Sequence, residues 1–220
     1  MPCLVDKKVL TRSEVLCLLC HMTLCSLKKR PQHPWWITFE IWLRDGQCCA
    51  IAYLHTLFVY FSRSFAAKIP LCGEIVFQKK VSGALPLDVL KQCTFSSVEV
   101  KLDGAIGDLP LPEVDFANKN IGYGKTGTQE EMIFGSTPEL CVAMLFCEAM
   151  KDNEAIFMSG AFKVAELSGY GLDVSSFITF LSFLSSGDVS PHLLWERLKH
   201  CEVKEGEDLF LHLQTKIESA

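Results

Sequence analysis

The chain has 220 residues, of which 49% are hydrophobic and 21% are charged, and its formal net charge is −5. This length suits one domain with a helical extension, and the apolar fraction excludes an intrinsically disordered chain. The acidic balance excludes a protein that grips duplex DNA through a basic face, so no direct DNA binding is expected.

Membrane insertion and export leave no signal in the sequence. The longest apolar run, Cys48 to Phe61, is shorter than the roughly 20 residues that a spanning helix needs, so it predicts a buried helix and no membrane contact. No continuous apolar stretch precedes Arg12, and the 11 cysteines are odd in number and mostly lie in apolar helical stretches. Reduced thiols in an intracellular protein of the nucleus or the cytoplasm are therefore expected.

The first third of the chain has mainly helical patterns. Residues 11–28 carry a broad apolar stripe behind Ser13, which can cap a helix. Residues 35–43 are aromatic and rich in β-formers, which favours a strand. Residues 48–62 again predict a buried helix.

The middle of the chain changes to alternating and short apolar patterns. Four segments have the composition of strands: 74–77, 97–102, 113–117 and 155–158. Thr137-Pro138-Glu139 is a strong helix start, and the helix is expected to end near Asn153. Strand, loop, helix and strand in this order predict a βαβ unit and an α/β fold with a partly parallel sheet. Residues 175–216 predict helical pieces.

The string Cys17-Leu-Leu-Cys20-His21 matches the C-x-x-C-H pattern of haem attachment. Because it falls inside an apolar helix and no export signal is evident, core packing is the better interpretation. A zinc site would need a second ligand pair at suitable spacing, which Cys48-Cys49 does not supply. Neither a metal nor another cofactor is expected.

Gly124-Lys125-Thr126 matches the end of a P-loop, G-x-x-x-x-G-K-[ST]. The first position of that pattern is Lys119 rather than glycine, so the phosphate cradle lacks its opening residue. A P-loop-like nucleotide binder stays as an alternative.

A second candidate site begins at the predicted strand 113–117, which brings Asp115 and Asn118 to its carboxyl end. A glycine-bearing loop follows, and Glu130 and Glu131 stand at the start of the next element. Paired carboxyl groups can protonate a leaving oxygen and support an oxocarbenium-like centre, as in glycosidases. Thr128-x-x-Glu131 is also a capping box, and periodicity alone favours that structural role.

Several motifs resemble the poly(ADP-ribose) glycohydrolase family. They are Asp115-Phe-Ala-Asn118, Gly122-Tyr123-Gly124, Gln129-Glu130-Glu131, Pro138-Glu139-Leu140, Asp152-Asn153-Glu154 and Ser168-Gly169-Tyr170. Residues 10–25 and 57–61 are similar to segments of that family's accessory domain. The resemblance implies an α/β/α macrodomain-like fold, here incomplete, with an N-terminal helical portion. It divides the chain into a mainly helical accessory portion (1–66), a partial catalytic core (67–170) and a C-terminal helical segment (171–220).

The resemblance also implies hydrolysis of ribose–ribose O-glycosidic bonds of poly(ADP-ribose), with release of ADP-ribose by a monomeric protein. By position, Glu131 would be the general acid/base and Glu130 would position the ribose hydroxyls. The remaining ligand-binding positions implied by the motifs are Asp115, Asn118, Gln129, the diphosphate loop Gly122-Tyr123-Gly124, and Tyr170 on the adenosine side.

The sequence departs from the family pattern in three places. Tyr123 replaces the middle glycine of a triplet, where a positive φ would be costly. The loop before Gln129 is short, and no N-W-G-C-G-x-F-G-G-D segment occurs anywhere. Because a pocket without one wall holds its ligand poorly, activity is expected to be impaired or lost, as in a truncated and diverged member. A non-catalytic ADP-ribose-binding module is the main alternative.

Overall fold

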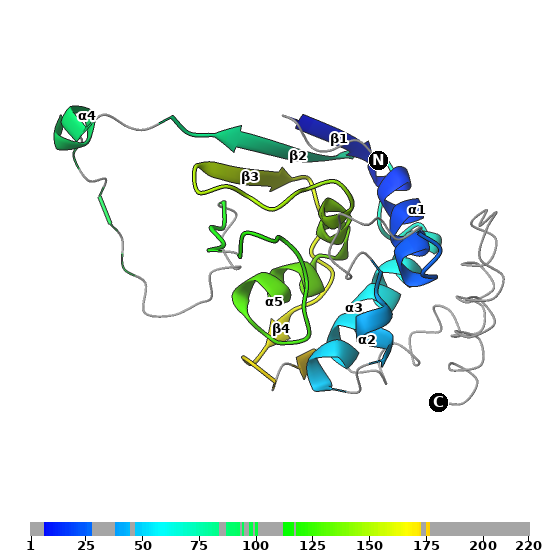
Figure 1. Ribbon diagram of the computed structural model, residues 1–220. Helices are drawn as coiled ribbons and strands as arrows, with labels where there is room; N and C mark the ends of the chain where they lie inside the picture. The colour runs from blue at the N-terminus through cyan, green and yellow to red at the C-terminus, as the bar shows by residue number, and fades with distance from the viewer. Residues whose placement is uncertain are drawn as a thin grey trace.

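The computed structural model describes residues 7–27, 38–44, 47–83, 87–92, 94, 97–98, 100, 112–116, 118–172 and 175–176. Its core is a three-stranded sheet that lies above a group of helices (Figure 1). Every structural statement below concerns these residues.

Helix α1 (Arg12–Thr23) forms within the predicted range 11–28, but it ends five residues before the expected end. Its cap is Thr11 rather than Ser13: the Thr11 hydroxyl accepts from the amide of Glu14, and the Glu14 carboxylate accepts from the Thr11 amide. This capping box satisfies two donors at the helix start. Buried Val15, Leu19 and Met22 turn toward the core.

The aromatic segment 35–43 is not a strand in its described part. Residues 38 and 39 form a turn, and helix α2 (Glu40–Arg44) follows. The β propensity of the segment is overridden by packing, because Phe39 and Trp42 are both buried. Helix α3 (Cys48–Phe65) confirms the predicted buried helix and is the longest element described.

The sheet has the order β1-β2-β3, and both neighbouring pairs are antiparallel. Its strands are β1 (Lys7–Thr11), β2 (Glu74–Val81) and β3 (Glu154–Ser159). The predicted strands at 74–77 and 155–158 are thus confirmed, whereas the expected parallel βαβ pairing is wrong for the described strands. Residues 74–81 pair back onto both the start of the chain and the segment after residue 153, so they form the central strand.

One face of this sheet carries the core. The register aligns Leu10 with Ile75, and Phe77 with Met158, so these side chains share a face. Ile75 and Phe77 are completely buried. Helices α2, α3 and α5 lie on one side of the sheet (Figure 1). Alternate residues such as Phe157, which is 54% exposed, occupy the opposite face.

The segment that leads into the candidate site is less regular than the sequence predicts. Residues 112–116 are extended but pair with no described strand, and Ser97, Val98 and Val100 are not in a strand either. Helix α5 (Gln129–Ser136) is capped by Thr128. The predicted long helix after Thr137 is instead a short 3₁₀ helix, η2 (Pro138–Leu145), which is completely lined by buried residues.

Three further elements complete the described chain. Helix α4 (Leu87–Gln92) stands apart from the other helices (Figure 1). Strands β4 (Leu167–Ser168) and β5 (Ser175–Ser176) form a small antiparallel pair. Helical pieces were expected over residues 175–216, but residues 175 and 176 form β5, and the rest of that range lies outside the described residues.

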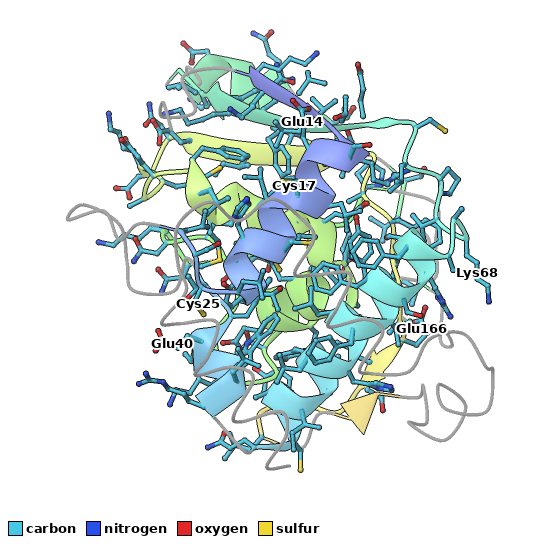
Figure 2. All side chains as sticks on the ribbon, turned by 90° about the vertical axis from the view of Figure 1, so that its right-hand side faces the viewer. Glu14, Cys17, Cys25, Glu40, Lys68 and Glu166 are labelled. Atoms are coloured by element: carbon cyan, nitrogen blue, oxygen red, sulfur yellow. The ribbon has the colours of Figure 1, made fainter. Side chains whose placement is uncertain are left out.

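The cysteines of C-x-x-C-H lie on α1 in different environments. Cys17 is exposed and Cys20 is completely buried, so the pair does not offer two accessible thiols to a haem. Figure 2 shows Glu14 at the start of α1 and Cys17 along the helix. All eight described cysteines are free thiols. No helix in the described ranges has both the length and the apolar character to cross a membrane.

Glu139 in η2 is the one charged residue that is completely buried in the described part of the chain. Its carboxylate accepts from Arg12 Nε at 2.7 Å, from the Tyr60 hydroxyl at 2.9 Å and from the Phe162 amide at 2.7 Å. A buried carboxylate is tolerated only when it is paired and hydrogen-bonded. These contacts therefore hold α1, α3, η2 and the segment after β3 together.

Arg12 extends this network to two loops. Its guanidinium donates to the carbonyl oxygens of Pro70 at 3.0 Å, Cys72 at 3.3 Å and Gly160 at 2.7 Å. The planar guanidinium supplies five donors in a fixed geometry, which suits a junction where several carbonyl groups converge. Arg12 thus ties the loops before β2 and after β3 to the same buried carboxylate.

We expect Arg12→Met to lower the free energy of unfolding by about 3–5 kcal/mol, because the Glu139 carboxylate stays buried without its cation. Urea denaturation measures this loss. Lys163→Met is the matched control, since it removes a cation from the exposed pair with Glu166 and should cost less than about 1 kcal/mol. Equal losses in the two variants would contradict the central role of Glu139.

Candidate active site

Glu130 lies in the first turn of α5 and points toward the preceding loop. Its Oε1 accepts from the amide of Gly122 at 2.8 Å. Burial raises the pKa of Glu130 to about 7, the amides of Gly122 and Asn118 offset part of this rise, and the negative charges of Asp115 and Glu131 add to it. A carboxyl group with a pKa near neutrality can exchange a proton at physiological pH.

Glu131 is held by the capping box that the sequence left open as an alternative. Its Oε2 accepts from the Thr128 amide at 3.0 Å and from the Thr128 hydroxyl at 2.9 Å. The hydroxyl of Thr126 donates to the same oxygen. Three donors thus fix one carboxylate oxygen, whereas Oε1 faces Gly124. The capping role and a role at the site are not exclusive, because the same donors fix the direction of the carboxylate.

Two glycines of the loop are required by close contacts. Gly122 has a φ of +138°, and a Cβ there would overlap the side chain of Met144. A Cβ at Gly124 would overlap Oε1 of Glu131. The loop therefore lies directly against η2 on one side and against a site carboxylate on the other.

Tyr123, between these glycines, is a core residue and is only 3% exposed. Its ring contacts Phe39 with centroids 5.0 Å apart and Trp42 at 4.4 Å. Its φ is not positive, since Cys25 and Ala67 are the described non-glycine residues with positive φ. The expected backbone strain at Tyr123 is therefore absent. The buried ring anchors the loop, and a contact of Tyr123 with a ligand stays a prediction.

Asp115 and Asn118 lie next to these glutamates on irregular backbone rather than at the end of a strand. Asp115 is half-buried, and its pKa is raised by burial and by the charge of Glu113. Asn118 is exposed, and its side-chain oxygen accepts from the Asn120 amide at 3.1 Å, which forms a local turn. Gln129 Nε2 donates to the carbonyl oxygen of Val114 at 3.1 Å and so fastens α5 to the segment of Asp115.

Tyr170 stands apart from the glutamates and is 74% exposed. Its neighbour Gly171 exchanges two backbone hydrogen bonds with Gly127, at 2.5 and 3.2 Å. This bridge brings the segment of Tyr170 beside the loop that precedes α5. Of the predicted site residues, the structure thus brings together Asp115, Asn118, Gly122, Gly124, Glu130 and Glu131 and fastens Gln129 beside them. It exposes Tyr170 next to the bridge to Gly127 and buries Tyr123.

The P-loop alternative fits the loop geometry poorly. In a P-loop the threonine hydroxyl contacts Mg²⁺, but the hydroxyl of Thr126 donates to Glu131. Within the described ranges, no group of three or more His, Cys, Asp or Glu side chains is arranged to hold a metal ion.

Sequence reasoning missed two aromatic residues whose hydrogen bonds hold the loop before α5. Trp42 Nε1 donates to the carbonyl oxygen of Gly124 at 2.8 Å, and the Tyr53 hydroxyl donates to that of Thr126 at 2.6 Å. In the sequence, both residues look like ordinary apolar residues of the N-terminal third. Their indole N–H and phenol O–H groups could have indicated this role, because such groups usually donate to an acceptor when they are buried.

Comparison with known proteins finds a similar family over the part of the chain that holds this site. The sequence profile described as "Poly (ADP-ribose) glycohydrolase (PARG), Macro domain fold" matches residues 88–193, which include the loop, both glutamates and Tyr170. Over these residues the chain is similar to the poly(ADP-ribose) glycohydrolase family. Its helices and small antiparallel sheet agree with the mixed α/β class of this fold family.

Two curated relatives are similar to this chain over about half of its length or somewhat more. Poly(ADP-ribose) glycohydrolase 1 of Arabidopsis thaliana is 38% identical over 118 residues, which are 50% of this chain and 21% of the relative. Poly(ADP-ribose) glycohydrolase 2 of Caenorhabditis elegans is 32% identical over 142 residues, which are 61% of this chain and 29% of the relative. The chain therefore spans less than a third of the length of these relatives.

We expect the carboxyl group of Glu130 to titrate with a midpoint of about 7 in a ¹³C NMR experiment. The same titration should be missing from the Glu130→Gln variant. Asp115→Asn should lower the midpoint, because it removes a neighbouring negative charge. Glu166→Gln, a change on the exposed surface, should leave it unchanged. A midpoint near the ordinary value of 4.5 in the unmodified chain contradicts the assignment.

The same pKa predicts the direction of one contribution to stability. The pKa of Glu130 in the folded chain lies above its ordinary value of 4.5, so its contribution is complete below pH 4.5 and is lost as the pH rises through about 7. The loss of melting temperature between pH 5 and pH 8 should therefore be smaller in Glu130→Gln than in the unmodified chain. An equal loss in both proteins would contradict it.

Proposed function

We propose that this chain acts on poly(ADP-ribose), hydrolysing ribose–ribose O-glycosidic bonds to release ADP-ribose, with an activity that is impaired. The observation that carries the proposal is the gathering of Glu130, Glu131, Asp115 and the Gly122 amide around one loop, where Glu130 has a pKa of about 7. Two carboxyl groups with different environments are what a glycosidic reaction needs.

The proposed roles follow the family motif. Glu131 would act as general acid/base at the glycosidic oxygen, and Glu130 would hold the ribose hydroxyls. The backbone at Gly122 and Gly124 would approach the diphosphate, and exposed Tyr170 would contact the adenosine. The matching profile describes a macrodomain fold, and the finer α/β/α arrangement belongs to this proposal.

The roles of the two glutamates also show where activity would be lost. A general acid must reach the leaving oxygen, but Oε2 of Glu131 already accepts from three donors and Oε1 faces Gly124. Glu130 accepts from the Gly122 amide at 2.8 Å, and its pKa is raised. The chain also lacks the second phosphate-binding string expected of the family. Hydrolysis would then require Glu131 to exchange a capping bond for the substrate.

A non-catalytic ADP-ribose-binding module is the second candidate, and the engagement of Glu131 favours it. A carboxylate that serves only as a cap still leaves Asp115, Glu130 and the loop amides to contact a ribose and a diphosphate. The two candidates make the same prediction for binding and opposite predictions for turnover.

We expect the full chain to release ADP-ribose slowly from poly(ADP-ribose), and Glu131→Gln to reduce that rate about a hundredfold or more, because general acid catalysis contributes at least that much. Chromatography of the products measures the rate. Glu166→Gln serves as the control and should keep the full rate.

Calorimetry with ADP-ribose on the same proteins separates the two candidates. Binding without turnover would support the non-catalytic module. Neither binding at millimolar ADP-ribose nor turnover would contradict both. A larger thermal shift with ATP and Mg²⁺ than with ADP-ribose would favour the P-loop alternative instead.

A further inference from the structure

Tyr53 lies where three parts of the structure meet. It belongs to α3 and is completely buried. Its ring lies against Gly135 of α5, where a Cβ would overlap the ring atoms. Its hydroxyl reaches the loop before α5 and donates to the carbonyl oxygen of Thr126 at 2.6 Å. One side chain of the N-terminal helices thus contacts both the candidate catalytic helix and the loop that precedes it.

The contact continues to a carboxylate of the site. Thr126, whose carbonyl oxygen accepts from Tyr53, donates its own hydroxyl to Oε2 of Glu131. The bond from Tyr53 holds the backbone of Thr126 in place, and from that position one staggered rotamer brings its hydroxyl to Glu131. Burial and the negative charge of Glu131 both raise the pKa of Tyr53, so its hydroxyl keeps its proton over the whole physiological range.

A second donor fixes the other end of the same loop. Trp42 of α2 donates to the carbonyl oxygen of Gly124 at 2.8 Å, and its ring packs on Tyr53 with centroids 5.2 Å apart. The Cys49 thiol of α3 donates to the carbonyl oxygen of Gly171 at 3.2 Å, next to Tyr170. The N-terminal helices therefore supply hydrogen-bond donors to the loop of the glutamates and to the segment of Tyr170.

We propose that Tyr53 is a positioning residue of the site, which acts through Thr126 to hold the carboxylate of Glu131 in the direction that the reaction or the bound ribose requires. The effect of Tyr53 on the reaction or on the bound ribose rests on the proposed function. Its hold on Glu131 through Thr126 does not depend on any ligand. The helices before residue 66 thus have a direct part in arranging the site, in addition to their packing in the core.

Tyr53→Phe removes only the hydroxyl and keeps the ring against Gly135. We expect the amide of Thr128, which donates to Glu131 Oε2, to exchange its hydrogen about tenfold faster in this variant, since the loss of one hydrogen bond changes an equilibrium by about that factor. Hydrogen exchange by NMR on the full, ligand-free chain measures the rate. Thr126→Val should give a similar increase, and Thr126→Ser, which keeps the hydroxyl, should stay close to the unmodified chain.

The double variant tests whether Tyr53 acts through Thr126. If it does, Tyr53→Phe combined with Thr126→Val exchanges at the rate of either single variant, because both remove the same connection. A rate about a hundredfold above the unmodified chain means that the two effects multiply, which would overturn the proposal. An unchanged rate at Thr128 in Tyr53→Phe would overturn it as well.

Tyr60→Phe is the matched control, because it removes a buried tyrosine hydroxyl from the same helix. That hydroxyl donates to Glu139 of η2 rather than to the loop before α5. We expect this variant to raise the rate of amide hydrogen exchange in strand β2 and to leave the exchange rate of the Thr128 amide unchanged. Faster exchange at Thr128 in Tyr60→Phe to the same degree as in Tyr53→Phe would show a general loss of stability and would overturn the positioning role.

Calorimetry with ADP-ribose on the same variants separates this inference from the proposed function. If the unmodified chain binds ADP-ribose, Tyr53→Phe should weaken binding several-fold and Tyr60→Phe should not. If the unmodified chain does not bind ADP-ribose, the proposed function fails, and the exchange rates at Thr128 still decide whether Tyr53 holds Glu131. Unweakened binding in Tyr53→Phe would contradict the proposed consequence for the ligand.

Discussion

The buried carboxylate of Glu139 is the interaction on which the described structure depends. Arg12, Tyr60 and the amide of Phe162 reach it from three separate parts of the chain, and Arg12 also donates to the loops before β2 and after β3. A carboxylate in this position is stable only when all of these partners are present. It therefore requires α1, α3 and the segment after β3 to meet at η2, and this meeting sets the position of α3 beneath the site loop.

Helix α3 in turn contacts the site loop. Tyr53 and Trp42 fix two carbonyl groups of the loop between Gly122 and Thr128, while buried Tyr123 anchors its middle among aromatic rings. The glutamates at the start of α5 then face this loop from the other side. Glu131 is held by the capping box, and Glu130 has a pKa near neutrality. The two adjacent carboxyl groups therefore have different environments, as two groups with different roles in a reaction require.

The parts of the fold that the sequence predicted correctly depend on local patterns. The apolar stripes of α1 and α3 and the short apolar runs of β2 and β3 needed no distant partner to be recognised. The motif around Glu130 and Glu131 was likewise local, and so was the capping box at Thr128. These features follow from residue spacing within one or two turns.

The parts that could not be predicted depend on distant contacts. The strand order brings residue 7 beside residue 78, and residues 40–43 of the aromatic run lie in helix α2 because Phe39 and Trp42 are buried. Tyr123 was expected to strain a phosphate loop, but the rings of Phe39 and Trp42 bury it without a positive φ. Arg12 and Glu139 are 127 positions apart, so nothing in their local sequence indicates that they pair.

The central claim is that the N-terminal helices hold the loop and the glutamates as one site for ADP-ribose. A crystal structure of the full chain grown with ADP-ribose tests it most directly. The account predicts the terminal ribose against Glu130 and Asp115, the diphosphate along Gly122 and Gly124, and the bonds from Tyr53 and Trp42 to the loop intact. Ligand bound elsewhere on the chain, or a loop detached from Tyr53 and Trp42 while ligand is bound, would contradict the account.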